Sequence, residues 1–177
     1  VKKLNGYLSN KGHLFNEAYF AGTDYASSLV PPLKLVKSII NSYDRLAKKG
    51  IGMIHTTEGI GFPKDLDVTL VSMLAKARSR ISQFQTRLFF QTMAVEKVMK
   101  RKLPRIGGCF ATALDGCLGA CDAALHEPYH NDPDNKGILF QEEETVIDFA
   151  KKANRGGLQI EMHAIGDAAV SRAVKAI

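Results

Sequence analysis

The stretch "GGLQIEMHAIGDAAV", residues 156–170, decides the fold that we expect. Two glycines precede a short apolar run that ends at His163, and a Gly-Asp pair then opens a helical pattern. Apolar residues at helical spacing before the glycines predict a helix over 142–155. Helix, glycine, buried strand and histidine therefore follow one another, and the histidine lies where the strand meets a turn.

The same order occurs earlier in the chain. A helix over 33–49 ends at Gly50, and "IGMIHTT" follows as a strand over 51–56 that carries His55. Hydrophobic spacing predicts the remaining elements: strands over 87–92, 108–114 and 158–163, and helices over 67–82, 94–102 and 166–177.

Strands that alternate with helices and are apolar throughout indicate a parallel sheet covered on both faces. The chain has no glycine-rich nucleotide-binding motif of the kind found in open sheets. His55, Asp115 and His163 instead follow the barrel rule, by which functional groups lie at the carboxyl ends of strands. Since a complete barrel needs about 250 residues, we predict a partial (β/α)8 barrel over 33–177, preceded by an irregular segment over 1–32.

Composition excludes several classes of protein. The 177 residues, 45% of them hydrophobic, can bury the core of one globular domain, and no apolar run reaches the roughly 20 residues of a membrane span. Neither a signal peptide nor a membrane partner is expected. The net charge of +6 would suit nucleic acid, but the basic run over 97–105 lacks interleaved aromatic residues. We therefore expect a solvated helix end there, not a nucleic-acid site.

The three cysteines Cys109, Cys117 and Cys121 match neither a disulfide framework nor a zinc motif. We expect buried or half-buried free thiols, and hence a reducing cytoplasm.

His163 has two interpretations from position alone, a core histidine or a metal ligand. Glu161 alternates onto the same side of the strand, and Asp167 lies just beyond the turn, so both are candidate outer-shell partners, as is His55. The loop over 114–140, with Asp115 and Gly116 at its start, is either a binding element or a structural surface loop.

Three segments together resemble the amidohydrolase superfamily, specifically the amidohydrolase-3 group, which includes N-substituted formamide deformylases and proteins labelled exoenzyme regulators. They are "KKGIGMIHTT", "LDGCLGACDAALHEPYHNDPDNKG" and "GLQIEMHAIGDAAV", in the order and spacing of that group. The resemblance covers about residues 33–177. It implies a metal, zinc by expectation, bound by His163 at the end of the fifth barrel strand, with Asp115 and Gly116 in the substrate-side loop after the fourth. It also implies metal-assisted hydrolysis of non-peptide C–N bonds in small amide-type substrates.

The sequence departs from that group at two places. Many relatives have a lysine four residues before the Asp-Gly pair, which when carbamylated bridges two metals, and Ala111 stands there. Cys109, expected on the same strand face as Ala111, could supply a thiolate instead. The group's His-x-His pair is absent, and its later histidine and aspartate would lie beyond Ile177.

We therefore expect an internal segment of a bacterial hydrolase that is inactive on its own, retains no metal and forms a homo-oligomer through exposed strand edges. The competing interpretations are a non-catalytic regulatory module on the same scaffold and a basic nucleic-acid binder.

Overall fold

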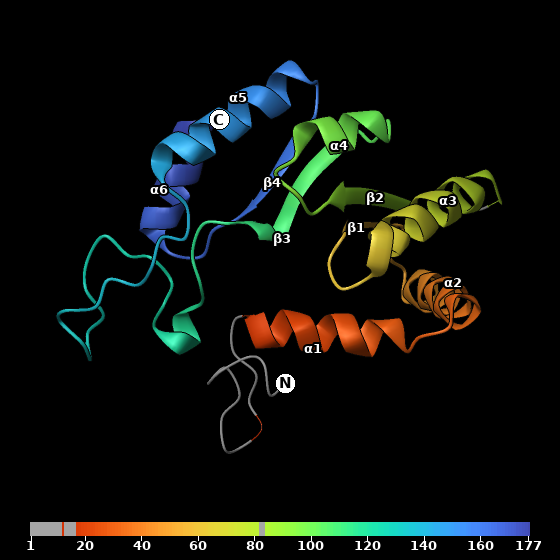
Figure 1. Cartoon of the computed structure of the whole chain (residues 1–177), viewed down its shortest axis with the longest axis horizontal. Helices are drawn as coiled ribbons and strands as arrows, with labels where there is room; N and C mark the ends of the chain where they lie inside the picture. Colours follow the sequence, from red (N-terminus) through yellow and green to blue (C-terminus); the bar gives the residue numbers. More distant parts are fainter. Residues whose placement is uncertain (1–11, 13–16, 82–83) are drawn as a thin grey trace. The chain divides into compact units, whose positions relative to one another are not determined.

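The structure is a computed structural model that describes residues 12, 17–81 and 84–177 (Figure 1). Strands and helices alternate through most of the chain. In chain order the elements are α1 (Glu17–Ser28), α2 (Pro32–Lys48), β1 (Met53–Glu58), η1 (Pro63–Asp65), α3 (Leu66–Ile81), β2 (Gln85–Phe90), α4 (Val95–Lys100), β3 (Arg105–Ala113), η2 (Leu118–Ala120), α5 (Glu143–Arg155), β4 (Gln159–His163) and α6 (Asp167–Ala176). No helix among the described residues is long and apolar enough to cross a membrane.

The strands form one sheet in the order β1-β2-β3-β4. β2 pairs in parallel with β3, and β3 pairs in parallel with β4. The backbone N–H groups of Gln85 and Gln91 donate to Gly52 and Glu58, so β1 and β2 also advance in the same direction. A helix lies between each pair of consecutive strands in the chain. The predicted parallel α/β arrangement is confirmed.

The chain divides into two compact units, the first containing the described residues of Val1–Ile54 and Gly59–Arg87. In this unit Tyr43 of α2 packs against Phe84, with ring centroids 5.3 Å apart, and Asp44 forms a salt bridge with Arg78 of α3. Asp67, in the first turn of α3, is buried and accepts a hydrogen bond from the backbone N–H of Gly59 at 2.6 Å. These contacts join the two helices to the turn after β1.

The second unit comprises His55–Glu58 and Leu88–Ile177. Its helices α5 and α6 pack against each other, and α5 also packs against β4 (Figure 1). One buried cluster lies beneath the loop after β3 and the start of α6, and its members are Leu114, Ala124, Val146 and Ala169. This cluster supports the carboxyl ends of β3 and β4, where the candidate site lies.

Both predicted helix–glycine–strand units are present. Gly50 follows α2 with φ +82°, and Gly157 follows α5 with φ +66°. A side chain rarely adopts these left-handed conformations, so glycine ends each helix and lets the chain turn into the next strand.

Two expectations from the sequence are corrected. The segment over 1–32 is not irregular throughout, because Glu17–Ser28 forms α1; its apolar residues lack a strong helical spacing, which explains why the pattern missed it. His55 does not end its strand, because β1 continues for three more residues to Glu58. The polar residues Thr56, Thr57 and Glu58 hid this extension, since we took the strand to end with its apolar run.

Candidate metal site at the carboxyl ends of β3 and β4

His163 is the last residue of β4 and is half-buried. Its Nδ1 lies 3.7 Å from the Sγ atom of Cys109, and its Nε2 lies 3.3 Å from the carbonyl oxygen of Gly116. A carbonyl accepts only, so Nε2 carries the proton and donates, which leaves a lone pair on Nδ1. A backbone carbonyl on one ring nitrogen is the usual arrangement for a histidine that binds a metal through the other nitrogen.

Cys109 lies where β3 becomes irregular. Gly108 pairs with Met162, yet the next pair along β4 is His163 with Ala113, so the residues between Gly108 and Ala113 bulge out of the ladder. A bulge redirects side chains that a regular strand would alternate between faces. The expectation that Cys109 and Ala111 share a strand face rested on regular alternation, and this part of β3 is irregular.

Thr112 closes this bulge. Its Oγ1 accepts a hydrogen bond from the Gly108 N–H at 2.9 Å and lies 2.8 and 2.7 Å from the carbonyl oxygens of Gly108 and Glu161. Thr112 is buried, so these contacts satisfy a hydroxyl that water does not reach.

Gln91 supports the bulge from the end of β2. Its Oε1 accepts a hydrogen bond from the Phe110 N–H at 2.9 Å, and its Nε2 donates to the Thr57 carbonyl at 3.2 Å. The side chain is buried and connects the ends of three strands. Sequence reasoning missed Gln91 and Thr112. A glutamine directly after the apolar run "RLFF" was a usable signal, because a buried amide needs partners.

Asp115, predicted in the substrate-side loop, is only 1% exposed. Its carboxylate accepts hydrogen bonds from the backbone N–H groups of Ala124, Ile165 and Gly166 at 2.7–2.9 Å. These bonds satisfy a charge that would otherwise be costly to bury. Asp115 thus joins the loop after β3 to the turn directly after His163, and both its oxygens are occupied by backbone donors.

Gly116 is next to Asp115 and supplies the carbonyl at His163 Nε2. A Cβ atom at this position would lie 2.2 Å from Oδ1 of Asp122, so glycine allows Asp122 to approach. The same oxygen accepts the Cys117 N–H. This close turn fixes the carbonyl that orients the imidazole.

Asp167 lies in the first turn of α6 and is exposed. Its Oδ1 accepts the backbone N–H groups of His126 and Ala168, both at 2.9 Å. The hydrogen bond from His126 is the main cause that lowers the pKa of this carboxyl below its ordinary value. Asp167 therefore anchors the loop after β3 to α6, and its role as an outer-shell partner of His163 stays a prediction.

Glu161 and His55, the other two predicted outer-shell partners, differ in their surroundings. Glu161 is half-buried, and its Oε2 is buried without a hydrogen-bond partner among the described residues. His55 is exposed and packs against Phe89, with ring centroids 5.6 Å apart.

All three cysteines are free, but Cys109 and Cys117 are exposed. The expectation of buried or half-buried thiols is thus wrong for these two, because both lie outside regular sheet pairing.

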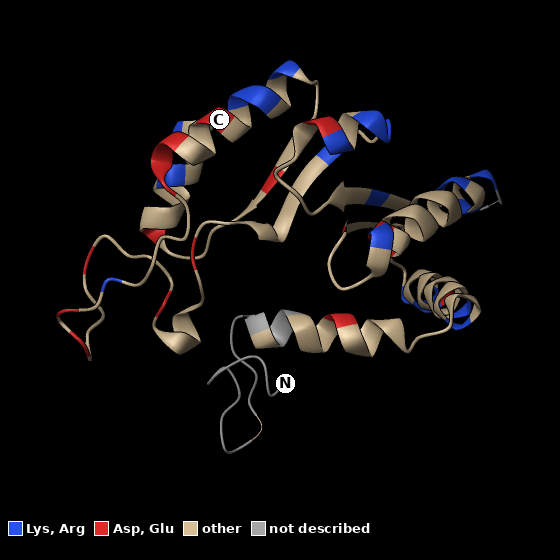
Figure 2. Ribbon diagram, viewed as in Figure 1, with Lys and Arg blue, Asp and Glu red and all other residues tan. Residues whose placement is uncertain are grey.

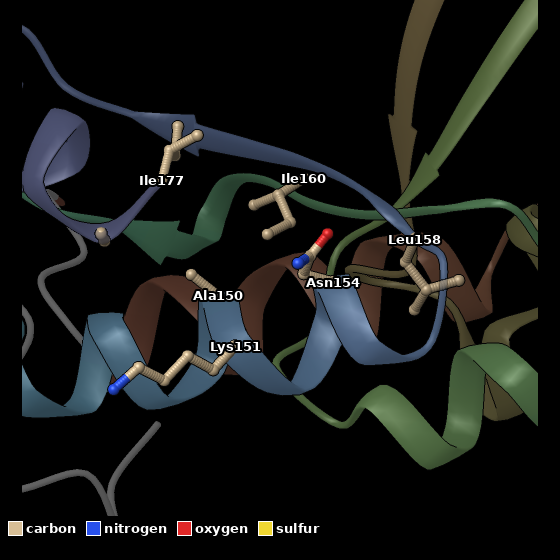
Figure 3. A pocket seen from close by; sticks show the side chains of 7 residues that line it. Ala150, Lys151, Asn154, Leu158, Ile160 and Ile177 are labelled. Atoms are coloured by element: carbon tan, nitrogen blue, oxygen red, sulfur yellow. The ribbon is translucent and has the colours of Figure 1, made fainter.

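A cavity of about 290 Å³ in the second unit lies away from this chemistry (Figure 3). Residues of α5, such as Ala150 and Asn154, line it together with Leu158 and Ile160 near the start of β4 and Ile177. His163 ends the same strand at its opposite end, so this cavity is not the candidate metal site.

Charge is distributed in the pattern expected of solvated helices (Figure 2). Glu143 and Glu144 begin α5, and Lys152 and Arg155 end it. In α4 the last turn carries Lys97 and Lys100, and Lys97 also lies over the Phe90 ring, 4.9 Å from its centroid. Acidic first turns and basic last turns complement the helix dipole. The basic run over 97–105 thus includes the last turn of α4, where positive charges complement the helix dipole.

No family model matches the chain. Among curated proteins it is 28% identical over 184 residues to "Putative amidohydrolase YtcJ" of Bacillus subtilis (strain 168), an alignment that covers 100% of this chain and 34% of that protein. It is 30% identical over 123 residues to "Protein LONG AFTER FAR-RED 3" of Arabidopsis thaliana, covering 64% of this chain and 20% of that protein. The chain thus spans about a third or less of these relatives.

Two solved structures share its fold. Both are uncharacterized metal-dependent hydrolases, one from Pyrococcus furiosus with a TM-score of 0.72 at 18% identity, the other from Pyrococcus horikoshii OT3 with a TM-score of 0.68 at 23% identity. Each match covers 97% of this chain, and 37% and 36% of the two structures respectively. The sequence similarity to a putative amidohydrolase along the whole chain bears out the resemblance that the three motifs predict, and the two solved structures bear out the fold.

Proposed function

We propose that the chain forms part of a metal-dependent hydrolase that cleaves non-peptide C–N bonds in small amide-type substrates, with His163 as a metal ligand. The observation that carries the proposal is the geometry of His163. Its imidazole stands at the carboxyl end of a parallel strand, with Nε2 on the Gly116 carbonyl and Nδ1 facing the Cys109 sulfur. That edge of a parallel α/β sheet is where barrel enzymes place their functional groups.

The donor set fits part of a metal centre. The residues 12, 17–81 and 84–177 contain no group of three or more His, Cys, Asp or Glu side chains arranged to hold a metal ion. A catalytic zinc has three protein ligands, so the proposed centre needs ligands beyond His163 and Cys109. A divalent metal, zinc by preference, would lower the pKa of a bound water and polarise the scissile carbonyl.

The chain's own residues position the imidazole. Gly116 sets which nitrogen of His163 carries the proton, and Asp115 holds the turn that follows His163. Gln91 and Thr112 hold the bulge beside the ring. Each of these contacts reduces the number of orientations open to His163, which favours a defined ligand geometry.

The test uses the whole protein that contains this chain. N-formyl and N-acyl amines serve as substrates, released amine is assayed, and plasma emission measures bound metal. We expect His163→Ala to abolish turnover and to lower the metal content, because losing one of three or four ligands removes both affinity and water activation. His130→Ala is the matched control, since His130 is exposed in the loop after β3. Full activity in His163→Ala would refute the proposal.

A non-catalytic regulatory module is the second candidate. Ala111 favours it, because alanine cannot form the carbamate that bridges two metals in the enzymes that this chain resembles. In that case the whole protein would hydrolyse none of the amides even when supplied with zinc, cobalt or manganese. For either candidate we propose a cytoplasmic location, since all three cysteines are free.

A further inference from the structure

Cys109 and His163 form a sulfur–nitrogen pair. The Sγ and Nδ1 atoms are 3.7 Å apart, although 54 residues separate the two positions in the chain. Because Nε2 faces the Gly116 carbonyl, the nitrogen that faces the sulfur is the one with the lone pair. Both atoms of the pair can therefore donate electrons to the same cation once the thiol loses its proton.

The separation of the two atoms suits a shared metal ion. Zinc–sulfur and zinc–nitrogen bonds of about 2.3 and 2.0 Å at a tetrahedral angle put sulfur and nitrogen about 3.5 Å apart. The observed 3.7 Å differs from this by a small side-chain movement. Cys109 is exposed, so a cation can approach it without unfolding the sheet.

The backbone on both sides of Cys109 is held in place by glycine conformations and by side-chain hydrogen bonds. Gly107 and Gly108 have φ values of +103° and +144°, and the Gln91 and Thr112 side chains hold the backbone on either side of the cysteine. A Cβ on Gly108 would lie 2.5 Å from Cγ of Gln91. The register of β3 with β4 up to Gly108 already brings Cys109 beside His163, and Gln91 and Thr112 hold the irregular backbone that follows.

We propose that Cys109 supplies a thiolate ligand, adjacent to His163 Nδ1, to the metal of this site. This rests on the proposed function and deepens it, because a thiolate and an imidazole select zinc, cobalt or cadmium over magnesium or calcium. Coordination exchanges the thiol proton for the metal and releases that proton to solvent. In the 177-residue chain, water completes the coordination sphere.

The test is a titration of the reduced chain with cobalt(II), followed by absorption. Thiolate ligation produces a sulfur-to-cobalt charge-transfer band in the near ultraviolet, which imidazole alone does not give. We expect the band in the wild type and its loss in Cys109→Ser. Cobalt affinity should fall at least about tenfold in Cys109→Ser, since loss of mere outer-shell partners already costs 10–100-fold. Cadmium should displace the cobalt, and magnesium should not.

Cys117→Ser is the matched control, because Cys117 is also an exposed free thiol and lies in the loop directly after β3. We expect it to keep both the band and the affinity, and far-ultraviolet circular dichroism checks that each variant folds. A band lost in Cys117→Ser but kept in Cys109→Ser would overturn the proposal. So would cobalt binding that needs His163 but shows no charge-transfer band, a result that leaves the proposed hydrolase intact. Cobalt affinity that is unchanged in His163→Ala would instead contradict the metal role of His163 itself.

Discussion

At the scale of single residues, His163 is held by contacts that orient it without burying it. It lies against the Gly116 carbonyl and the Cys109 thiol and is half-buried at the end of β4. A half-buried side chain that its neighbours orient contributes less to the core than to the geometry of a ligand site. Asp115 has the opposite character, since it is fully buried and its three backbone hydrogen bonds join two loops.

The first prediction concerns His163 in the isolated chain. His163→Ala should change the free energy of unfolding by less than about 1.5 kcal/mol, a range typical of substitutions outside the core. Urea denaturation measures this change. The dialysed chain should also retain less than one zinc, because the pair Cys109–His163 has fewer ligands than the four of a structural zinc site. One tightly bound zinc per chain in plasma emission would contradict this.

At the scale of elements, the pairing of β3 with β4 depends on glycine. Gly107 pairs with Glu161 at φ +103°, and a Cβ there would lie 2.0 Å from the Glu161 carbonyl oxygen. A side chain at position 107 would therefore force β3 and β4 apart at this pair. The regular part of the β3–β4 ladder, which ends at Gly108, therefore includes a position where no side chain fits.

The second prediction follows from this close approach. Gly107→Ala should destabilise the chain by at least about 2 kcal/mol, because it combines a backbone clash with a strained conformation. Gly119→Ala is the control, since nothing lies within 4 Å of a Cβ built there. We expect it to change stability by about 0.5 kcal/mol or less. Equal unfolding midpoints for the two variants would show that the β3–β4 register differs from the one described.

The third prediction concerns the start of α6 and pH. The pKa of Asp167 in the folded chain is lowered from 3.8, chiefly by the His126 N–H, so the carboxylate stabilises the fold above its unfolded pKa. That contribution is lost as pH falls through the lowered folded pKa. Asp167→Asn should therefore be less stable than wild type at neutral pH, and the difference should shrink toward about pH 3. Urea titrations at several pH values test this, and a pH-independent difference would refute it.

At the scale of the whole molecule, we infer self-association from surfaces on two elements. In the described part of the chain, β4 stands at one end of the sheet order. The side chains of Val170, Val174 and Ile177 recur at helical spacing on α6 and its end, and all three are exposed. Open strand edges and exposed apolar stripes commonly pair between chains.

The fourth prediction is that the 177-residue chain forms a dimer or a larger homo-oligomer. Light scattering at micromolar concentration should give a mass at least twice that of the 19.4 kDa chain. Val174→Lys should shift the mass toward the monomer, because it places a charge in the apolar stripe. Lys151→Glu, a change of charge on α5, is the comparison variant. A wild-type chain that is monomeric across the concentration range would contradict the prediction.

The sequence by itself determined the alternation of helices and parallel strands and the position of His163. These follow from local causes: apolar spacing defines each element, and glycines such as Gly50 and Gly157 end the helices. The missed α1 and the longer β1 show the limit of that reasoning, because weak spacing and a polar strand end carry little local signal.

Only the tertiary structure decided what surrounds His163. The bulge in β3 depends on hydrogen bonds that Thr112 and Gln91 make with residues up to 49 positions away, and Asp115 takes donors from the turn after β4. Such partners are set by how strands pair and loops fold back, not by the spacing of residues within an element. For this reason the sequence indicated a histidine at a strand end, while the cysteine beside it and the carbonyl behind it emerged from the packing of β3 against β4.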